Sequence, residues 1–204
     1  MNQTPTTPRD DVETPQGNMR PADFDVAVVG SGFAGALAAM MARRMGWRVI
    51  LIERGRHPRF VIGESSTPLA NLILEQIATR FELGPLIPLA KWGTWQAVRP
   101  GLPAGLKRGF TFYRHQPGLA WSPSPDLSNE LLVAASPNDH VADTHWYRPA
   151  FDQNLVHQAV AMGVEFVDGV DLDPRAPPPV AELTGHRAGA PFRVRDRKST
   201  RLNS

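Results

Sequence analysis

At 204 residues the chain is long enough for one large domain or one and a half average ones, and 42% hydrophobic residues suffice for a packed core. The 22 basic and 20 acidic residues give a formal net charge of +2, which offers no electrostatic reason to expect nucleic acid or an anionic membrane as a partner. Cysteine is absent, which excludes disulfides, thiolate nucleophiles and cysteine metal sites.

The N-terminal segment, residues 1–23, is polar and rich in proline, and it has no apolar stretch of the kind found in signal peptides. We therefore predict that residues 1–23 are disordered and that the ordered domain begins at Phe24. The sequence also has no run of about 18 apolar residues, so no transmembrane helix is predicted. The expected protein is soluble and cytoplasmic, with neither membrane nor nucleic acid as a partner.

The first elements expected after this segment form a βαβ unit. Residues 25–29 are apolar and β-branched without alternation, which is typical of a parallel strand covered on both faces. Residues 34–45 are rich in helix-forming Ala, Leu, Met and Arg, and Gly46 ends this helix. A second strand is expected over 48–53, so the strand, glycine turn, helix and strand fit within about 30 residues, the size of a βαβ unit.

The turn of this unit, residues 30–35, reads Gly-Ser-Gly-Phe-Ala-Gly, the G-x-G-x-x-G fingerprint of dinucleotide-binding proteins. Gly30 permits a tight turn, Gly32 lets backbone amides approach a pyrophosphate, and Gly35 lets the helix pack closely on the strand. The helix N-terminus offers its N–H groups and positive dipole end to the phosphates. Glu53 stands at the end of the next strand, where an acid accepts hydrogen bonds from ribose hydroxyls. The candidate cofactor-binding residues here are Gly30, Gly32, Phe33, Ala34, Gly35, Glu53 and Arg54.

The remainder of the chain continues the mixed pattern and predicts an α/β, Rossmann-like domain with a parallel sheet. A helix is expected from Pro68 to Phe81, whereas the many glycines and prolines of residues 85–125 favour loops and short strands. The other expected elements are strands over 109–113, 131–135, 164–167 and 192–195 and a helix over 149–162. A βα turn that merely resembles the fingerprint is the alternative to a dinucleotide site, and the fingerprint alone does not separate FAD from NAD.

Two further stretches bear on that choice. Residues 63–68, Gly-Glu-Ser-Ser-Thr-Pro, follow Arg59-Phe60 and resemble the "R-x-x-G-E-S-x-x-P" stretch of flavin-dependent halogenases and their relatives among geranylgeranyl-reductase-like and aromatic-hydroxylase-like flavoproteins. Residues 145–152, His-Trp-Tyr-Arg-Pro-Ala-Phe-Asp, resemble a second landmark of this superfamily, in which an arginine precedes "x-x-F-D-x-x-L" on a helix that supports the FAD. The resemblance implies a Rossmann-like FAD-binding domain with FAD as the cofactor.

The same resemblance assigns roles to three more residues. It implies that Glu64 and Ser65 lie at the cofactor and that Arg148 contacts a phosphate or the ribose. The alternative for Glu64 and Ser65 is an N-terminal cap on the helix that starts near Pro68. The alternative for Arg148 is an exposed arginine ahead of a helix.

Flavin-dependent halogenases also need a lysine that captures or positions hypohalous acid, because an ammonium group donates hydrogen bonds and polarises the oxidant. In the family this lysine follows the G-E-S stretch within a "K-x-G-x-x-F/W" context. Lys91, in Lys-Trp-Gly-Thr-Trp, suits that placement and is the candidate catalytic residue. Lys107, in Lys-Arg-Gly-Phe-Thr-Phe, has a similar local pattern but lies farther along the chain. A surface lysine beside a tryptophan is the alternative interpretation of Lys91.

The resemblance therefore predicts a halogenase-like, FAD-dependent oxidoreductase that activates oxygen at reduced flavin to halogenate or oxygenate a small organic substrate, with aromatic compounds as a candidate class and a flavin reductase as a candidate partner. The alternatives are a non-halogenating monooxygenase or reductase of the same superfamily, a nucleotide-binding fragment without catalysis, and a nicotinamide-dependent dehydrogenase. Asp139, His140, Asp143 and His145 could ligate a metal, but we interpret them as solvated loop residues and expect no metal site.

The FAD-binding domain is expected to span residues 24–196 and to be truncated at its C-terminus. Flavoproteins of this type use a further "G-D" stretch at the cofactor and a sheet over the flavin ring, and we find neither in the sequence. Residues 197–204 do not continue any apolar pattern and resemble translated sequencing-adapter sequence. We therefore predict that this tail is non-native and that the chain is a gene fragment.

Overall fold

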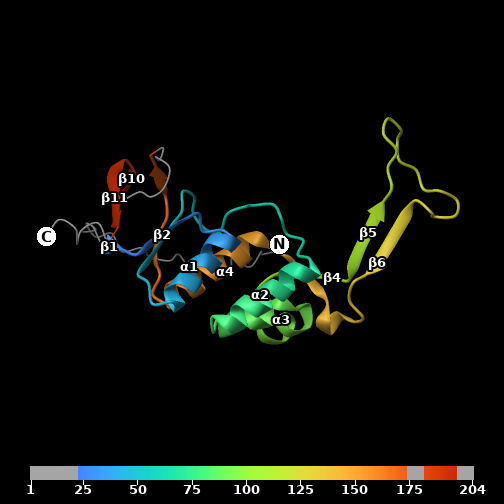
Figure 1. The fold of residues 1–204 in the computed structure, drawn as a ribbon, viewed down its shortest axis with the longest axis horizontal. Helices are drawn as coiled ribbons and strands as arrows, with labels where there is room; N and C mark the ends of the chain where they lie inside the picture. Colours follow the sequence, from blue (N-terminus) through green and yellow to red (C-terminus); the bar gives the residue numbers. More distant parts are fainter. Residues whose placement is uncertain (1–22, 174–181, 197–204) are drawn as a thin grey trace, which may run out of the picture.

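The structure, a computed structural model, describes residues 23–173 and 182–196. The predictions of a disordered N-terminal segment and of a non-native tail fall on residues 1–22 and 197–204, which lie outside the described residues. Asp23 is the first described residue and belongs to a strand. Figure 1 shows the elements in an extended series, with a sheet at one end, the helices in the middle and a two-stranded ribbon projecting at the other end.

The predicted βαβ unit is confirmed. Strands β2 (Val26–Val29), β3 (Val49–Ile52) and β8 (Glu165–Val167) form a parallel sheet in the order β2-β3-β8. Helix α1 (Phe33–Arg44) connects the first two strands. Its end follows from Gly46, whose φ of +87° belongs to the left-handed region that glycine adopts without strain.

A second sheet covers one face of this parallel sheet. Its order is β1 (Asp23–Phe24), β11 (Ala190–Asp196), β10 (Glu182–Arg187) and β9 (Val170–Leu172). Strand β11 confirms and extends the strand expected over 192–195, whereas β1, β9 and β10 were not predicted. Strand β10 contains Gly185, at which a Cβ would lie 2.3 Å from the carbonyl oxygen of Asp171 on β9. Close approach of the neighbouring backbone therefore explains a glycine inside this strand.

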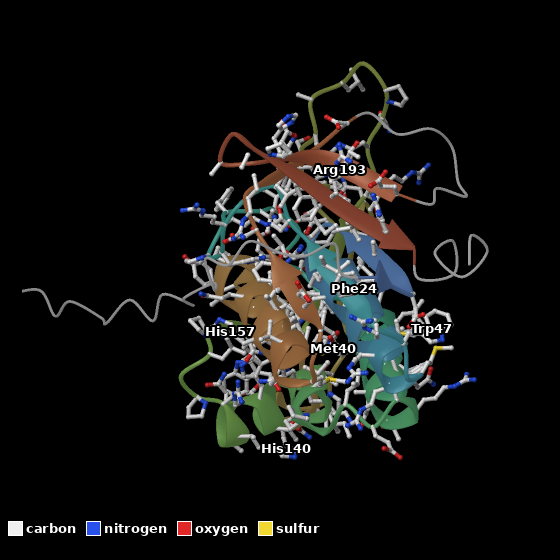
Figure 2. The ribbon with its side chains drawn as sticks, turned by 90° about the vertical axis from the view of Figure 1, so that its left-hand side faces the viewer. Phe24, Met40, Trp47, His140, His157 and Arg193 are labelled. Carbon is white, nitrogen blue, oxygen red and sulfur yellow. The ribbon has the colours of Figure 1, made fainter. Side chains whose placement is uncertain are left out.

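The uninterrupted apolar sequence of β3 follows from its position between two layers. Val49 and Leu51 belong to the core that faces the helices, whereas Ile50 and Ile52 belong to the core that faces the second sheet. All four side chains are buried. Met40 of α1 is also fully buried, whereas Trp47, at the turn before β3, is 43% exposed (Figure 2).

The remaining helices are α2 (Pro68–Arg80), the 3₁₀ helix η1 (Gly84–Ala90), α3 (Trp92–Val98) and α4 (Arg148–Ala161). The helices expected near 68–81 and 149–162 are confirmed. The expectation of only loops and short strands over 85–125 is wrong, because this region includes η1 and α3. Among the described residues, no helix combines the length and apolar character needed to cross a membrane.

Helix α3 forms because of a tertiary contact. Its Trp95 is completely buried, donates its indole N–H to the carbonyl oxygen of Leu102 at 2.9 Å and stacks on Phe151 of α4 with ring centroids 5.4 Å apart. A seven-residue helix is too short to display a helical periodicity, so its stability comes from this packing rather than from local propensity.

Two antiparallel pairs complete the fold. Strand β4 (Ala104–Lys107) pairs with β7 (Asp143–Trp146), just after the short 3₁₀ helix η2 (Asp139–Val141). Strand β5 (Gly109–Tyr113) pairs with β6 (Glu130–Ala134) in the projecting ribbon of Figure 1 and confirms the strands expected there. Strand β7 was not predicted, because its sequence Asp-Thr-His-Trp lacks the apolar alternation of a strand. Its Trp146 packs on Phe33 and Phe151, which ties β7 to the start of α1 and to α4.

Candidate functional site

The glycine turn has the geometry of an anion-binding loop. Gly30 has a φ of +95°, and its N–H donates to the carbonyl oxygen of Ile52 at 2.7 Å. A Cβ at Gly35 would lie 1.8 Å from the carbonyl oxygen of Gly30, so the close passage of helix and turn requires glycine there. Gly32 is the N-cap of α1 and has no side chain to cap the helix. The first amides of α1, including those of Phe33 and Ala34, are therefore available to an anionic ligand.

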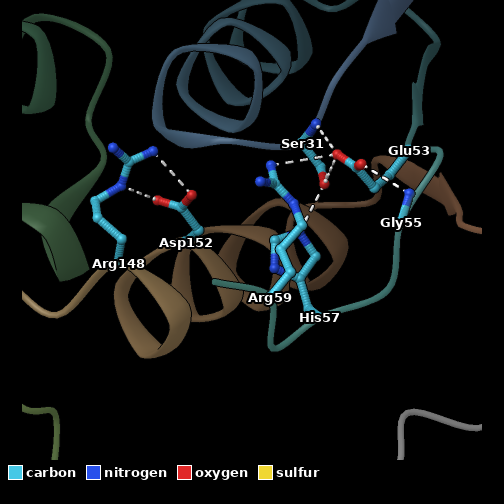
Figure 3. Close-up of polar contacts among 7 residues, drawn as sticks. All are labelled: Ser31, Glu53, Gly55, His57, Arg59, Arg148 and Asp152. Atoms are coloured by element: carbon cyan, nitrogen blue, oxygen red, sulfur yellow. Dashed lines mark hydrogen bonds and ion pairs between the residues drawn. The ribbon is translucent and has the colours of Figure 1, made fainter. Parts of the chain in front are cut away.

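Two guanidinium groups converge on this helix end. A Cβ placed on Gly32 would lie 3.4 Å from Nη2 of Arg59 and 3.8 Å from Nη2 of Arg148. Arg148 is held by two hydrogen bonds, from Nε and Nη2, to the fully buried carboxylate of Asp152 at 2.8 and 2.9 Å (Figure 3). Oδ2 of Asp152 lies 3.7 Å from the same Cβ position, so the site offers an anion such as a pyrophosphate guanidinium and helix N–H donors rather than a large net positive charge.

Glu53 lies at the carboxyl end of β3 and is nearly buried, with 8% of its surface exposed. Its Oε2 accepts hydrogen bonds from the backbone N–H and the hydroxyl of Ser31, both at 2.8 Å, and its Oε1 accepts one from the N–H of Gly55 at 2.9 Å (Figure 3). Burial acts to raise the pKa of Glu53, but these hydrogen bonds and the charge of Arg59 outweigh it and lower the pKa to about 2. Glu53 is therefore ionised at neutral pH and suited to accept hydrogen bonds from ribose hydroxyls.

His57 adds a group to this site that the sequence pattern did not indicate. Its Nε2 lies 2.7 Å from the hydroxyl oxygen of Ser31, while its Nδ1 is buried without a hydrogen-bond partner in the described part of the chain. Burial lowers the pKa of His57, and the nearby charge of Arg59 lowers it further. Arg59 belongs to the stretch that resembles the flavin-dependent halogenases, so that resemblance could have identified it as a site residue. Arg54 is exposed, and its side chain makes no hydrogen bond or ion pair with a described residue.

The Gly-Glu-Ser-Ser segment, residues 63–66, lies against strand β7. The N–H of Trp146 donates to the carbonyl oxygen of Glu64 at 2.7 Å, and the N–H of Ser66 donates to that of Thr144 at 3.2 Å. The carboxylate of Glu64 turns back and accepts a hydrogen bond from the N–H of Gly63 at 3.1 Å. The segment therefore extends along β7 and reaches away from the glycine turn.

The cap of α2 is supplied by Thr67, whose hydroxyl accepts a hydrogen bond from the N–H of Ala70 at 3.1 Å. The alternative in which Glu64 and Ser65 cap this helix is therefore wrong. Arg148 joins the segment to the glycine turn, since its Nη1 donates to the carbonyl oxygen of Gly63 at 3.2 Å. The interpretation of Arg148 as an unengaged, exposed arginine does not describe this geometry.

The two candidate lysines differ sharply in their surroundings. Lys91 forms an ion pair with Glu75 at 3.0 Å, and 40% of its side chain is exposed. Lys107 is only 7% exposed, and its ammonium donates to the hydroxyl of Ser65 at 2.6 Å and to the carbonyl oxygen of Ser66. Its Nζ also lies 4.0 Å from the ring centroid of Phe110. Lys107 thus contacts the Gly-Glu-Ser-Ser segment, whereas Lys91 lies at the surface between α2 and α3.

Two of the four possible metal ligands near β7 are engaged elsewhere. Asp139 pairs with Arg108 at 2.6 Å, and Asp143 accepts a hydrogen bond from Asn71 at 2.8 Å. Within residues 23–173 and 182–196, no group of three or more such ligands is arranged to hold a metal ion.

Comparisons with known proteins agree with the geometry of the glycine turn and its surroundings. The family model of the FAD dependent oxidoreductases matches residues 25–58. Monodechloroaminopyrrolnitrin halogenase PrnC of Pseudomonas fluorescens is 31% identical over 140 residues, which cover 69% of this chain and 24% of that protein. Tetracycline 7-halogenase of Kitasatospora aureofaciens is 26% identical over 144 residues, which cover 70% of this chain and 24% of that protein.

The chain belongs to the flavin-dependent halogenase superfamily. It spans about a quarter of the length of these curated members. The crystal structure of halogenase PltM in complex with phloroglucinol and FAD has the same fold, with a TM-score of 0.68 at 23% identity over 88% of this chain and 36% of that one. The chain thus has a Rossmann-like α/β fold that corresponds to 36% of that halogenase chain.

Proposed function

We propose that the complete protein is an FAD-dependent, halogenase-like oxidoreductase. The observation that carries this proposal is the nearly buried ammonium of Lys107, which donates to Ser65 of the same short segment whose Gly63 accepts a hydrogen bond from Arg148. When bound, reduced FAD supplies the electrons that activate molecular oxygen. A surface pair such as Lys91 with Glu75 offers no comparable enclosure.

The residues of the site fit FAD from its adenosine end onward. The carboxylate of Glu53 would accept the ribose hydroxyls, and the amides between Gly32 and Gly35 would bind the pyrophosphate. Arg59 and Arg148 would donate hydrogen bonds to the phosphates. The ionised state of Glu53 excludes a second phosphate on this ribose, which favours FAD over a 2′-phosphorylated nicotinamide cofactor.

Gly63 to Ser65 extends the site toward the reactive end of the cofactor. Two residues of extended chain span about 7 Å. This stretch separates the carbonyl oxygen that binds Arg148 from the hydroxyl that binds Lys107. Lys107 would thus lie beyond the phosphates.

Lys107 is our proposed reactive lysine, in place of Lys91, which the placement in the family pattern favours. An ammonium has three N–H bonds, and two of them are directed to Ser65 and Ser66. The third would donate to hypohalous acid and hold it away from bulk water, since Lys107 is almost completely buried. The ring of Phe110 covers the ammonium and excludes water on that side.

The substrate proposed is a small aromatic molecule. PltM was crystallised with phloroglucinol, and the names of the curated relatives refer to an aminopyrrolnitrin and a tetracycline. A flavin reductase is the proposed partner that supplies reduced FAD. A cytoplasmic location is part of the same proposal, and fractionation of the source cells would test it.

The test uses the full-length protein with reduced FAD, oxygen and either bromide or chloride. We expect a bound-flavin spectrum and halide-dependent substitution of an aromatic substrate. The variant Lys107→Met should abolish halogenation and retain the flavin spectrum, whereas Lys91→Met should keep most of the activity. Oxygenation that proceeds without halide would support the monooxygenase alternative, and loss of halogenation in Lys91→Met alone would restore Lys91 as the reactive residue.

A further inference from the structure

The antiparallel ladder between β4 and β7 places a carboxylate directly beside the proposed reactive lysine. Lys107 and Asp143 are paired residues in this ladder, so their side chains lie on the same side of the two-stranded sheet. Asp143 is 6% exposed, and its Oδ1 accepts a hydrogen bond from the amide of Asn71 on α2 at 2.8 Å. The fold therefore buries an acid and an amine as immediate neighbours.

The two carboxylate oxygens of Asp143 differ in their hydrogen bonding. Oδ2 of Asp143 is buried and has no hydrogen-bond partner among the described residues. The ammonium of Lys107 bonds instead to Ser65 and Ser66, so the two charges act on each other through space. A buried carboxylate with one unpaired oxygen is costly unless a positive charge stands close by.

The groups in direct contact with the ammonium of Lys107 are uncharged. Ser65 and Ser66 contribute only dipoles, and the third neighbour on this side is the ring of Phe110. The carboxylate of Glu64 is turned back to its own loop. Asp143 is thus the charged group that acts on Lys107 among the described residues.

Burial and the carboxylate oppose each other at the amine. Burial lowers the pKa of Lys107, and the charge of Asp143 raises it again. Without the carboxylate the amine would lose its proton at a lower pH. A neutral amine has two N–H bonds rather than three, so it could not hold both serine oxygens and also donate to a bound oxidant.

We propose that Asp143, held by Asn71, is a positioning residue that keeps Lys107 as an ammonium directed at Ser65 and Ser66. Its role in halogenation rests on the proposed function, whereas its effect on the charge of Lys107 does not. Nδ2 of Asn71 donates to the carboxylate of Asp143 and thereby fixes the position of this negative charge relative to Lys107.

The experiment measures the protonation of Lys107 directly in the full-length protein. Brief acylation with acetic anhydride at a series of pH values, followed by peptide mass spectrometry, gives the labelling midpoint of each lysine. Asp143→Asn should lower the midpoint of Lys107 by about one pH unit or more, the size of effect that a close buried charge produces. At a pH below the midpoint this corresponds to about tenfold faster labelling.

The matched control is Glu75→Gln, which removes the carboxylate beside the exposed Lys91. This variant should leave the midpoint of Lys107 unchanged, because the pair lies elsewhere on the surface. An unchanged Lys107 midpoint in folded Asp143→Asn protein would overturn the proposal.

A measurement on the unaltered protein covers the case in which Asp143→Asn does not fold. Carbon-13 NMR of labelled Lys side chains should find Lys107 protonated at pH 7. A neutral Lys107 amine at this pH would overturn the proposal.

Halogenation assays separate this inference from the proposed function. In Asp143→Asn the alkaline limb of the halogenation pH profile should move to lower pH, in parallel with the labelling midpoint. A shifted midpoint in a protein that never halogenates would remove the proposed function and leave the charge effect of Asp143 in place. Halogenation that requires Lys107 but has the same pH profile in Asp143→Asn would overturn the inference and keep the function.

Discussion

The pKa of Glu53 makes a quantitative prediction about stability in acid. The folded-state value of about 2 lies below the ordinary value of 4.5, so the stabilisation from this group is fully present above pH 4.5 and is lost as the pH falls toward 2. A depression of that size corresponds to about 3 kcal/mol of unfolding free energy. The side chain is nearly buried, so solvent screening removes little of it.

Glu53→Gln is the perturbation that isolates this contribution. The amide keeps the shape of the side chain but carries no charge and does not titrate. In the cofactor-free full-length protein, the unfolding free energy of the unaltered form should therefore fall more steeply below pH 4.5 than that of the variant. Denaturant unfolding at a series of pH values between 7 and 3 measures both curves.

The difference between the two curves tests the reasoning. It should shrink as the pH falls, by about 2 kcal/mol between pH 5 and pH 3. Glu82→Gln is the matched control, because Glu82 forms an exposed ion pair in which 83% of its side chain is accessible, and its curve should parallel that of the unaltered protein. A difference for Glu53→Gln that stays constant with pH would refute the assigned hydrogen-bond network.

Three further variants probe the turn, the phosphate site and the core. Gly35→Ala should lower the unfolding free energy by more than about 3 kcal/mol, because its Cβ would overlap a carbonyl oxygen of the turn, whereas Gly84→Ala, with open space around the added Cβ, should change thermal unfolding little. Arg148→Lys should weaken FAD binding about tenfold in a fluorescence titration, because lysine cannot make the two hydrogen bonds that hold Arg148 on Asp152. The control Arg108→Lys, at the exposed pair with Asp139, should have no effect on FAD binding. Trp95→Phe should cost about 1 kcal/mol in denaturant unfolding, because the ring stack remains while the indole hydrogen bond is lost; no loss of stability would argue against that bond.

Much of the fold could be predicted because its signals are local. The strand at 25–29, the glycine turn and the helix that ends before Gly46 are each encoded by a few consecutive residues, and all are observed. Helices α2 and α4 likewise display apolar residues at helical spacing. For these elements the tertiary structure agrees with the local preference.

The elements that escaped prediction depend on contacts distant in sequence. Helix α3 forms around Trp95, whose partners are Leu102 and Phe151. Strands β7 and β10 contain polar residues or glycine and are defined by the strands beside them. Nothing in such sequences reports the neighbour that will stabilise them.

The same distinction between local sequence pattern and tertiary contacts explains why the sequence favoured Lys91 over Lys107. Lys91 fits the spacing of the family pattern, yet the spacing does not reveal that Glu75 lies one helix away and pairs with it. Lys107 fits the local pattern equally well, and only the pairing of β4 with β7 brings it to Ser65. The site therefore required the fold before its lysine could be chosen.

The Gly63–Ser66 segment has a practical consequence. Its Gly63 gives one hydrogen-bond acceptor to Arg148, and Ser65 and Ser66 give two to Lys107, so only Glu64 separates the two sets of contacts. A ligand that draws Arg148 toward its phosphates pulls on the same few atoms that hold the lysine. The chemical reactivity of Lys107 should therefore change when the cofactor binds, and this change can be measured without turnover.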